Sequence, residues 1–141
     1  MKNEHIVKLT IGIKAPVEEV WNALIDPDLI KKYLFGTNVI TDWKVGSPIL
    51  YKGMWKGKAY EDKGIILNII PNRLLETTYW SGMSGIPDIP ENYKKVNYKL
   101  VPNNNGTSLT LTQDNNATEE EKKHSEQNWK MVLDGLKKIL E

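Results

Sequence analysis

Tryptophan and tyrosine are the side chains of this sequence best suited to contact a ligand. The 141-residue chain has five Trp and six Tyr but only one Phe. Trp and Tyr combine a large apolar ring with a polar tip that needs a hydrogen-bond partner when buried, whereas a core that needs only bulk can use Phe. A cavity lined by such rings would be apolar with a few hydrogen-bonding groups, as small-molecule sites usually are. The alternative is that the rings simply fill a closed core.

The residues that we expect to line such a cavity lie on inward faces of predicted strands and on the apolar stripe of the last helix. Gln113 is the polar one: it continues the inward parity of Leu109 and Leu111. Its amide could orient a ligand carbonyl or hydroxyl, or bond to a neighbouring tyrosine or to backbone, and we favour the second. The expected ligand-binding set is Tyr51, Trp55, Ile66, Tyr79, Tyr98, Gln113, Trp129, Val132, Leu133 and Leu136.

Other chemistries have few candidate residues. Asp42, Glu61 and Asp62 could do acid–base work if one were buried with a raised pKa, but their polar surroundings favour solvated strand ends, one of which could reach a pocket mouth. His5 and His124, the only histidines, have no helical i, i+4 partner histidine and no nucleophile motif. No Gly-x-x-x-x-Gly-Lys phosphate loop occurs. We therefore expect no catalytic residue, no metal and no cofactor.

Composition argues against several classes of function. Lys and Arg number 19 and Asp and Glu 18, so the net charge is +1 and no global field attracts nucleic acid or an anionic membrane. Arg73 is the only arginine, the residue that bidentate phosphate and guanine contacts favour. The absence of cysteine excludes disulfides, thiol catalysis and thiolate metal sites. The chain starts without a signal-peptide run, and the apolar stretch 64–70 is too short to span a bilayer. We expect a cytoplasmic protein that neither enters membranes nor binds nucleic acid.

Hydrophobic periodicity predicts one strand and two short helices at the start of the chain. Apolar and polar residues alternate over 7–13, as in a half-buried strand. After Pro16, apolar residues recur at helical spacing as far as Leu24. Asp26 can cap a second helix over 28–34, with Pro27 at its first position.

Six further strands and a long helix follow. Turn residues separate strands at 37–43, 49–55, 58–70, 74–80, 93–101 and 107–113. The segment 81–91 between two of them reads as a loop in which Met83, Ile86 and Ile89 form a lid or contact surface, or a tether packed on the sheet edge.

Thr118 and Glu121 form a capping box that starts a helix over 118–140. Its apolar stripe can cover one face of the sheet, and tight turns make neighbouring strands antiparallel. The sequence predicts one α+β domain over 1–141, a helix-grip fold in which a curved seven-stranded antiparallel sheet surrounds the long C-terminal helix, with two short helices after the first strand. Met131, opposite the stripe, is an ordinary surface residue or part of a dimer contact, so we expect a monomer or a weak homodimer.

Several segments resemble the START-like (Bet-v-1-like, SRPBCC) superfamily. The run IKAPVEEVWNAL at 13–24 opens like its members. The branch named after the activator of heat-shock-protein ATPase is similar at four further segments: WKVGSP at 43–48, YEDKG at 60–64, PNRLL at 71–75 and NWKMVLDGLKKILE at 128–141. The resemblance covers essentially the whole chain in order. It implies the helix-grip architecture with a cavity between sheet and helix.

Residues and resemblance together leave three functions open. The first is binding of a small hydrophobic or amphipathic molecule between the sheet and the C-terminal helix, and we favour it. The second is a protein-interaction module that acts through its surface, because the branch is named after a co-chaperone in which this domain is one of two parts. The third is a cyclase-like enzyme that uses the cavity as a shaped vessel, for which the sequence offers no convincing acid–base residue.

Overall fold

The computed structural model describes residues 5–82 and 85–141, without the side chain of Trp55. The predictions made for Met83 and for the Trp55 side chain therefore lie outside the described residues. The described residues form seven strands, three α-helices and one short 3-10 helix. In chain order they are β1 (Val7–Ile13), α1 (Val17–Ile25), α2 (Pro27–Tyr33), β2 (Asn38–Ile40), β3 (Pro48–Trp55), β4 (Lys58–Ile70), β5 (Leu74–Tyr79), the 3-10 helix Pro90–Asn92, β6 (Lys94–Asn103), β7 (Gly106–Gln113) and α3 (Glu119–Leu140).

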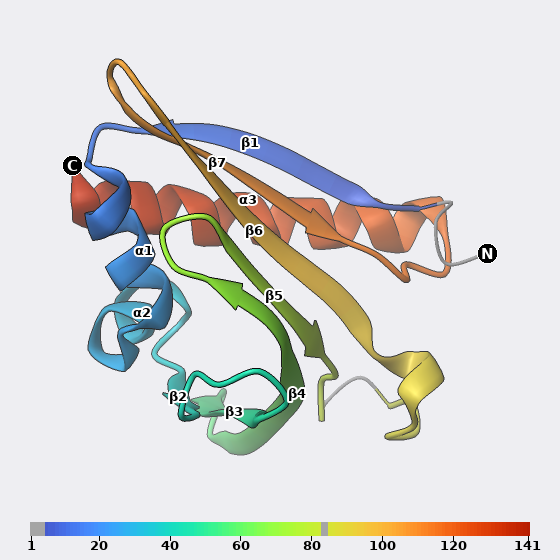
Figure 1. Cartoon of the computed structure of the whole chain (residues 1–141). Helices are drawn as coiled ribbons and strands as arrows, with labels where there is room; N and C mark the ends of the chain where they lie inside the picture. Colours follow the sequence, from blue (N-terminus) through green and yellow to red (C-terminus); the bar gives the residue numbers. More distant parts are fainter. Residues whose placement is uncertain (1–4, 83–84) are drawn as a thin grey trace.

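The strands form one antiparallel sheet in the order β1-β7-β6-β5-β4-β3-β2. Figure 1 shows the sheet curving in front of α3, which runs along the β1–β7–β6 side, while α1 and α2 lie near the C-terminal end of α3. The predicted fold class, a helix-grip arrangement with seven antiparallel strands and two short helices after the first strand, is confirmed. No helix among the described residues is long and apolar enough to cross a membrane.

Alternation along the strands decides which side chains face α3. Val7 and Ile13 of β1 are buried, and they pair with Gln113 and Thr107 of β7, which are buried too. Polar Lys8 and other even-numbered residues of β1 face outward. The inner face therefore presents a continuous apolar surface that needs a cover. On α3 the buried residues are Val132, Leu133 and Leu136.

Local capping places the helices as predicted. The Asp26 carboxylate accepts the Asp28 N–H at 2.9 Å, and Pro27 opens α2. At α3 the Thr118 hydroxyl accepts the Glu121 N–H at 3.0 Å. The Glu121 carboxylate accepts the Ala117 N–H, one residue before the cap, instead of the cap residue's own N–H. Each contact satisfies an N–H that the start of a helix would otherwise leave unpaired.

One predicted strand is much shorter than expected. Of the strand predicted over 37–43, only the three residues of β2, Asn38–Ile40, are extended and paired. The strand cannot continue through Trp43, because this residue has a φ of 60°. Side chains stabilise the turn there: the Thr41 hydroxyl accepts the Trp43 N–H at 3.4 Å and the Asp42 carboxylate accepts the Lys44 N–H at 3.1 Å. Thr and Asp side chains bonding to nearby backbone compete with strand pairing in this way.

Gly64 gives a direct test of the packing between β4 and β5. A Cβ atom at this position would collide with the backbone carbonyl of Thr78, whereas a Cβ at Gly12 would meet nothing within 4 Å. We expect Gly64→Ala to lower the free energy of unfolding by about 1–3 kcal/mol or more, as overpacking does. Gly12→Ala is the control and should change it by less than about 1 kcal/mol. Urea unfolding followed by circular dichroism measures both, and equal effects would contradict this packing.

Candidate functional site

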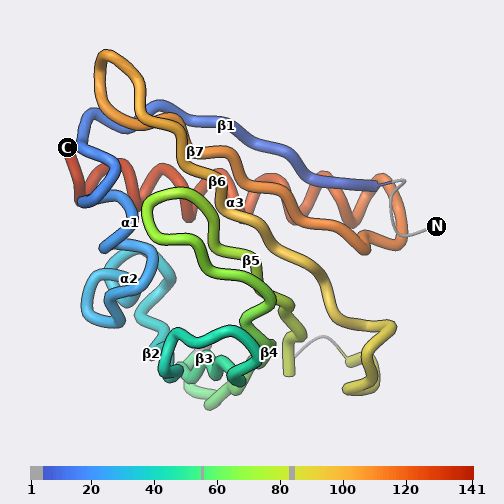
Figure 2. The backbone as a smooth tube through the Cα atoms, viewed as in Figure 1, coloured from blue at the N-terminus to red at the C-terminus, as the bar shows by residue number. Residues whose placement is uncertain are grey.

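A small cavity lies between the inner face of the sheet and the segment α1–α2–β2. Its volume is about 30 Å³. A water molecule needs roughly 10–15 Å³ of such space, so the cavity holds one or two waters and is too small for a metabolite as it stands. The backbone can be followed in Figure 2 from α2 through β2 to β3, a segment whose side chains close one side of the cavity. The lining residues are Leu24, Ile30, Tyr33, Leu34, Val39, Trp43, Ile49, Tyr51, Leu75, Thr77 and Tyr98.

The cavity lies nearer α2 than the prediction placed it. Tyr51 and Tyr98 line it as expected, and Tyr79 and Trp129 extend the same group of aromatic rings. Tyr79 meets Tyr51 edge-on with ring centroids 5.6 Å apart, and Trp129 meets Tyr98 edge-on at 6.2 Å. The four predicted residues therefore form two edge-on ring pairs, and each pair contributes one residue to the cavity lining.

The other predicted residues lie elsewhere in the interior. Ile66 is fully buried in β4 and does not line the cavity. Val132, Leu133 and Leu136 pack into the core on the β1–β7–β6 side, and α3 as described contributes no lining residue. The cause is geometric: α3 contacts β1, α1 and α2, whereas the residues opposite the sheet in the cavity lining come from α1, α2, β2 and the β2–β3 connection.

Three tyrosines line this largely apolar cavity: Tyr33, Tyr51 and Tyr98. The Tyr33 hydroxyl donates to the Ala23 carbonyl at 2.8 Å. Burial raises the pKa of Tyr51 well above its usual value, although a side-chain hydrogen bond with Thr77 acts in the opposite direction. Burial also raises the pKa of Tyr98, helped by the neighbouring tyrosines. The site therefore offers neutral phenols as hydrogen-bonding groups.

Asp62 is buried, which corrects the expectation of a solvated strand end. Asp62 is only 7% exposed, whereas Asp42 and Glu61 are exposed as predicted. The Tyr79 hydroxyl donates to one carboxylate oxygen at 2.5 Å, and the Gly82 N–H donates to the other at 2.9 Å. Both oxygens are thus engaged by the protein, and the carboxylate holds Tyr79 against Tyr51. Asp62 and Ile66 are four residues apart on β4, so their side chains face the same side of the sheet. Because Ile66 was expected to face inward, the same alternation could have placed Asp62 inside.

Sequence reasoning missed nine of the eleven lining residues, and the polar or aromatic ones among them are Tyr33, Trp43 and Thr77. Tyr33 was treated only as part of a short helix, and Trp43 only as a strand residue. Thr77 is buried on the inner face of β5 opposite Ile66. Strand parity could have indicated Thr77, but the other two depend on how α2 and the β2–β3 connection fold over the sheet.

Gln113 lies away from the cavity, in a polar cluster near the start of α3. Its amide N–H groups donate to the Asp114 carbonyl and, at 3.1 Å, to the Asn116 side-chain oxygen. Of the two roles considered for the Gln113 amide, bonding to backbone and to a neighbouring side chain is the one that the structure has. Its own amide oxygen is buried with no partner among the described residues.

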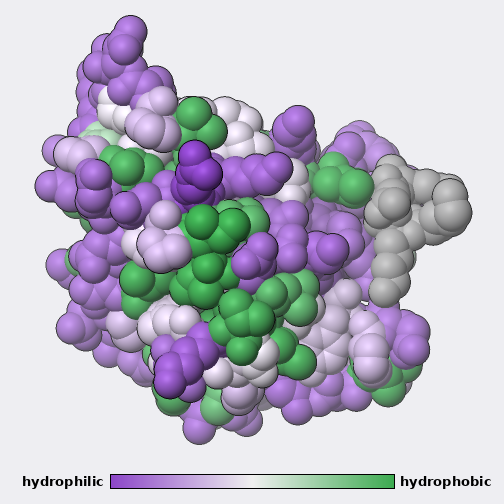
Figure 3. All heavy atoms as spheres, in the orientation of Figure 1, coloured by the Kyte–Doolittle hydropathy of each residue, from purple (hydrophilic) through white to green (hydrophobic). Residues whose placement is uncertain are grey.

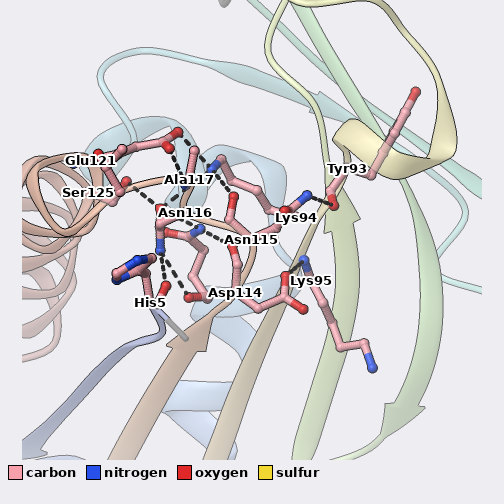
Figure 4. Close-up of polar contacts among 12 residues, drawn as sticks. His5, Tyr93, Lys94, Lys95, Asp114, Asn115, Asn116, Ala117, Glu121 and Ser125 are labelled. Atoms are coloured by element: carbon pink, nitrogen blue, oxygen red, sulfur yellow. Dashed lines mark hydrogen bonds and ion pairs between the residues drawn. The ribbon is translucent and has the colours of Figure 1, made fainter. Parts of the chain in front are cut away.

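Asn116 connects the elements around this cluster, as Figure 4 shows. Its amide donates to the His5 carbonyl at 2.8 Å, and its oxygen accepts from the Ser125 hydroxyl at 3.1 Å and the Lys94 ammonium at 3.4 Å. Lys94 also pairs with Glu121 at 3.2 Å. These contacts join the start of β1, β6 and α3, so we assign the cluster to stabilising the fold.

The loop after β5 is tethered where it is described. The Trp80 indole N–H donates to the Ile86 carbonyl at 3.2 Å, and Asp88 pairs with Lys63. Burial and the Asp88 carboxylate raise the pKa of Tyr93 to about 12. Ile86 and Ile89 remain 43% and 44% exposed. The described part of the loop is therefore tethered, which was one of the two alternatives predicted, and a role as a lid or contact surface stays a prediction. No three His, Asp or Glu side chains within the described ranges converge to hold a metal ion.

Comparisons with known proteins agree with this fold. Residues 14–141 match the family described as activator of Hsp90 ATPase homolog 1-like protein. The solution structure of ChR145 from Cytophaga hutchinsonii is 51% identical, with a TM-score of 0.87 over 99% of this chain and 96% of that one. CalU16 from Micromonospora echinospora is 26% identical, with a TM-score of 0.67 over 93% and 71% of the two chains.

A more distant structure shares the fold alone. The Aha1 dimer from Colwellia psychrerythraea is 24% identical, with a TM-score of 0.74 over 96% of both chains. A search among curated proteins gave no match.

The buried tyrosines predict how the protein responds to alkali. In the unfolded chain a phenol titrates near pH 10, but in the folded protein the pKa of Tyr33, Tyr51, Tyr79 and Tyr98 is raised, first of all by burial. Above pH 10 the unfolded chain therefore loses protons first, and the stability present below pH 10 is lost as the pH rises.

We expect these four phenols to ionise only as the protein unfolds. Tyrosinate absorbance and far-ultraviolet circular dichroism, recorded in one alkaline titration, should then show coincident transitions, and Tyr51→Phe should reduce the amplitude of the cooperative absorbance step. Complete tyrosine ionisation before any loss of secondary structure would contradict the buried positions of these hydroxyls.

Proposed function

Because the chain belongs to the activator of Hsp90 ATPase homolog 1-like family, whose START-like fold often serves for ligand binding, we propose that it binds a small amphipathic molecule in the cavity under α2. The observation that carries the proposal is the group of hydroxyls in an otherwise apolar interior. A core that needed only bulk would use Phe, since a buried hydroxyl without a partner costs about 1–3 kcal/mol. Tyr98 lines the cavity and burial keeps its phenol neutral, so we take its hydroxyl as the contact for a ligand oxygen.

The size of the cavity requires a wall that can move, and Trp43 is suited to be that wall. It lines the cavity from the connection between β2 and β3, outside any helix or strand. Its φ of 60° is an outlier for a bulky side chain and costs on the order of 1–3 kcal/mol. Strained residues of this kind cluster at ligand clamps and switch regions. Outward movement of Trp43 would add the space of an indole ring to the cavity.

The lining also limits the charge of the ligand. Every residue that lines the cavity is apolar, aromatic or a threonine, so no charged side chain is available as a counter-ion. Burying an unpaired ionised group is costly, so the proposed ligand is neutral, with an apolar body and one or two oxygens. This property separates it from the acidic lipids and nucleotides that cationic pockets bind.

The role of Trp43 can be tested by removing its side chain. Trp43→Ala should bind indole, and saturating indole should raise its melting temperature more than that of the unaltered protein, because a ligand that binds only the folded state stabilises it. Trp80→Ala is the matched control: Trp80 is also half-buried but stacks on Tyr93 away from the cavity. An indole response no larger for Trp43→Ala than for Trp80→Ala would rule out an expandable cavity. A surface-acting module would then become the better hypothesis.

The role of Tyr98 can be tested with two ligands that differ by one hydroxyl. Tyr98→Phe should weaken the binding of 2-naphthol by about tenfold, the effect of one hydrogen bond of about 1.4 kcal/mol, and leave the binding of naphthalene unchanged. Isothermal calorimetry in the Trp43→Ala background measures both. Equal losses for the two ligands would show that the hydroxyl does not contact the ligand.

A further inference from the structure

A second and larger hollow lies on the outer side of the sheet, at the turn between β4 and β5. It is an open groove of about 530 Å³, within the range of small-molecule sites. Its walls come from the β4–β5 turn, the later part of β6 and the first residue of α1. Its lining residues include Val17, Pro71, Arg73, Leu74, Lys99 and Val101. None of them lines the interior cavity, so the two hollows are separate.

One wall of this groove is apolar although it faces solvent. Val101 is 60% exposed, and Leu74 and Val17 are partly exposed beside it. Ile70, which precedes the turn, is 42% exposed. Figure 3 shows apolar side chains gathered over the β4–β6 part of this face, with hydrophilic side chains around them. Contact with an apolar group would remove this surface from water, which is favourable.

The other feature of the groove is two cations without acidic partners. Arg73, the only arginine of the chain, and Lys99 are both exposed and line the groove. Neither side chain makes an ion pair or hydrogen bond with any residue in the described ranges. Glu18 and Glu19, next to Val17 in α1, are exposed. Within the described residues, neither of them pairs with Arg73 or Lys99. By contrast, the cationic groups of Lys63 and Lys94 each pair with an acidic side chain.

Backbone hydrogen bonds hold these groups in place. The Arg73 N–H donates to the Ile70 carbonyl at 3.0 Å and closes the turn, and the Leu100 N–H donates to the Arg73 carbonyl at 2.8 Å. Leu74 pairs directly with Lys99 across β5 and β6. Directly opposed residues of an antiparallel pair project from the same face, so the apolar wall and the cations are adjacent by register.

We propose that this groove binds a small amphipathic carboxylate. The carboxylate lies between the Arg73 guanidinium and the Lys99 ammonium, and the apolar tail lies along Val17, Leu74 and Val101. Guanidinium and carboxylate match geometrically and form charge-assisted hydrogen bonds. The groove is thereby selective for anions, whereas the interior cavity has no charged lining residue.

The test compares 4-phenylbutyrate with 4-phenylbutanol, which has the same apolar tail but no charge. In a nitrogen–proton NMR titration we expect 4-phenylbutyrate to shift the amides of Leu74, Leu100 and Val101, with an affinity that falls as salt is added. Arg73→Gln and Lys99→Gln should each weaken binding about fivefold. Lys95→Gln is the matched control: Lys95 is exposed on the same strand and the same face as Lys99 but lies outside the groove, so its substitution should leave the affinity unchanged.

Three results would overturn the proposal. One is equal affinity for 4-phenylbutanol and 4-phenylbutyrate, which would mean that the cations contribute nothing. Another is an equal loss of affinity in Lys95→Gln, which would indicate attraction by the general surface charge. The third is a set of shifts centred on Tyr51, Thr77 and Tyr98, which would locate the carboxylate in the interior cavity. All three substituted side chains are exposed, and circular dichroism checks that the fold is retained.

Discussion

The structure depends on α3 being held along the inner face of the curved sheet. Burial of Val132, Leu133 and Leu136 supplies the apolar contact, and polar contacts fix the helix at both of its ends. At the C-terminal end, the Lys137 ammonium donates to the Gly12 carbonyl at 2.8 Å, and the Lys14 N–H donates to the Glu141 carboxylate at 2.9 Å. At the other end, the Asn116 cluster joins β1, β6 and α3. An apolar stripe alone would allow the helix to slide, whereas these directional bonds set its register on β1.

The position of α3 explains why the cavity lies where it does. Running along β1, β7 and β6, the helix covers one half of the inner face, and the half formed by β3, β4 and β5 needs another cover. There the cavity is closed by residues of three short segments, namely the end of α1, α2 and the stretch from β2 into the β2–β3 connection. Their side chains, Tyr33 and Trp43 among them, meet Tyr51 and Tyr98 from the strands, and the imperfect fit leaves a void. A long regular helix packs with few voids, whereas several short segments seldom do so.

Features set by neighbouring residues could be predicted from the sequence, and features set by distant contacts could not. Alternation in β1, the Asp26 cap and the Thr118 cap are local, and the structure has them where they were predicted. The turn at Trp43 is local too, but the residues around it also fit a strand pattern. The contacts of the Thr41 hydroxyl and the Asp42 carboxylate with nearby backbone decide in favour of the turn. Asp62 is a different case, because its charge suggested solvent while its burial depends on Tyr79 and Gly82, 17 and 20 residues away. The volume of the cavity reflects the packing of many side chains at once, which no periodicity encodes.

The two hollows are separated by a single layer of backbone, and this accounts for their opposite chemistry. Successive residues of β5 face opposite sides of the sheet, so Leu74 lines the outer groove while Leu75 lines the inner cavity. Both hollows thus share β5. None of the residues that line the inner cavity is charged, so the proposed recognition there relies on neutral hydroxyls. On the outside, water solvates Arg73 and Lys99 in the absence of a ligand, so unpaired cations are tolerated there. The same strand therefore lines the proposed neutral site on one face and the proposed anion-selective site on the other.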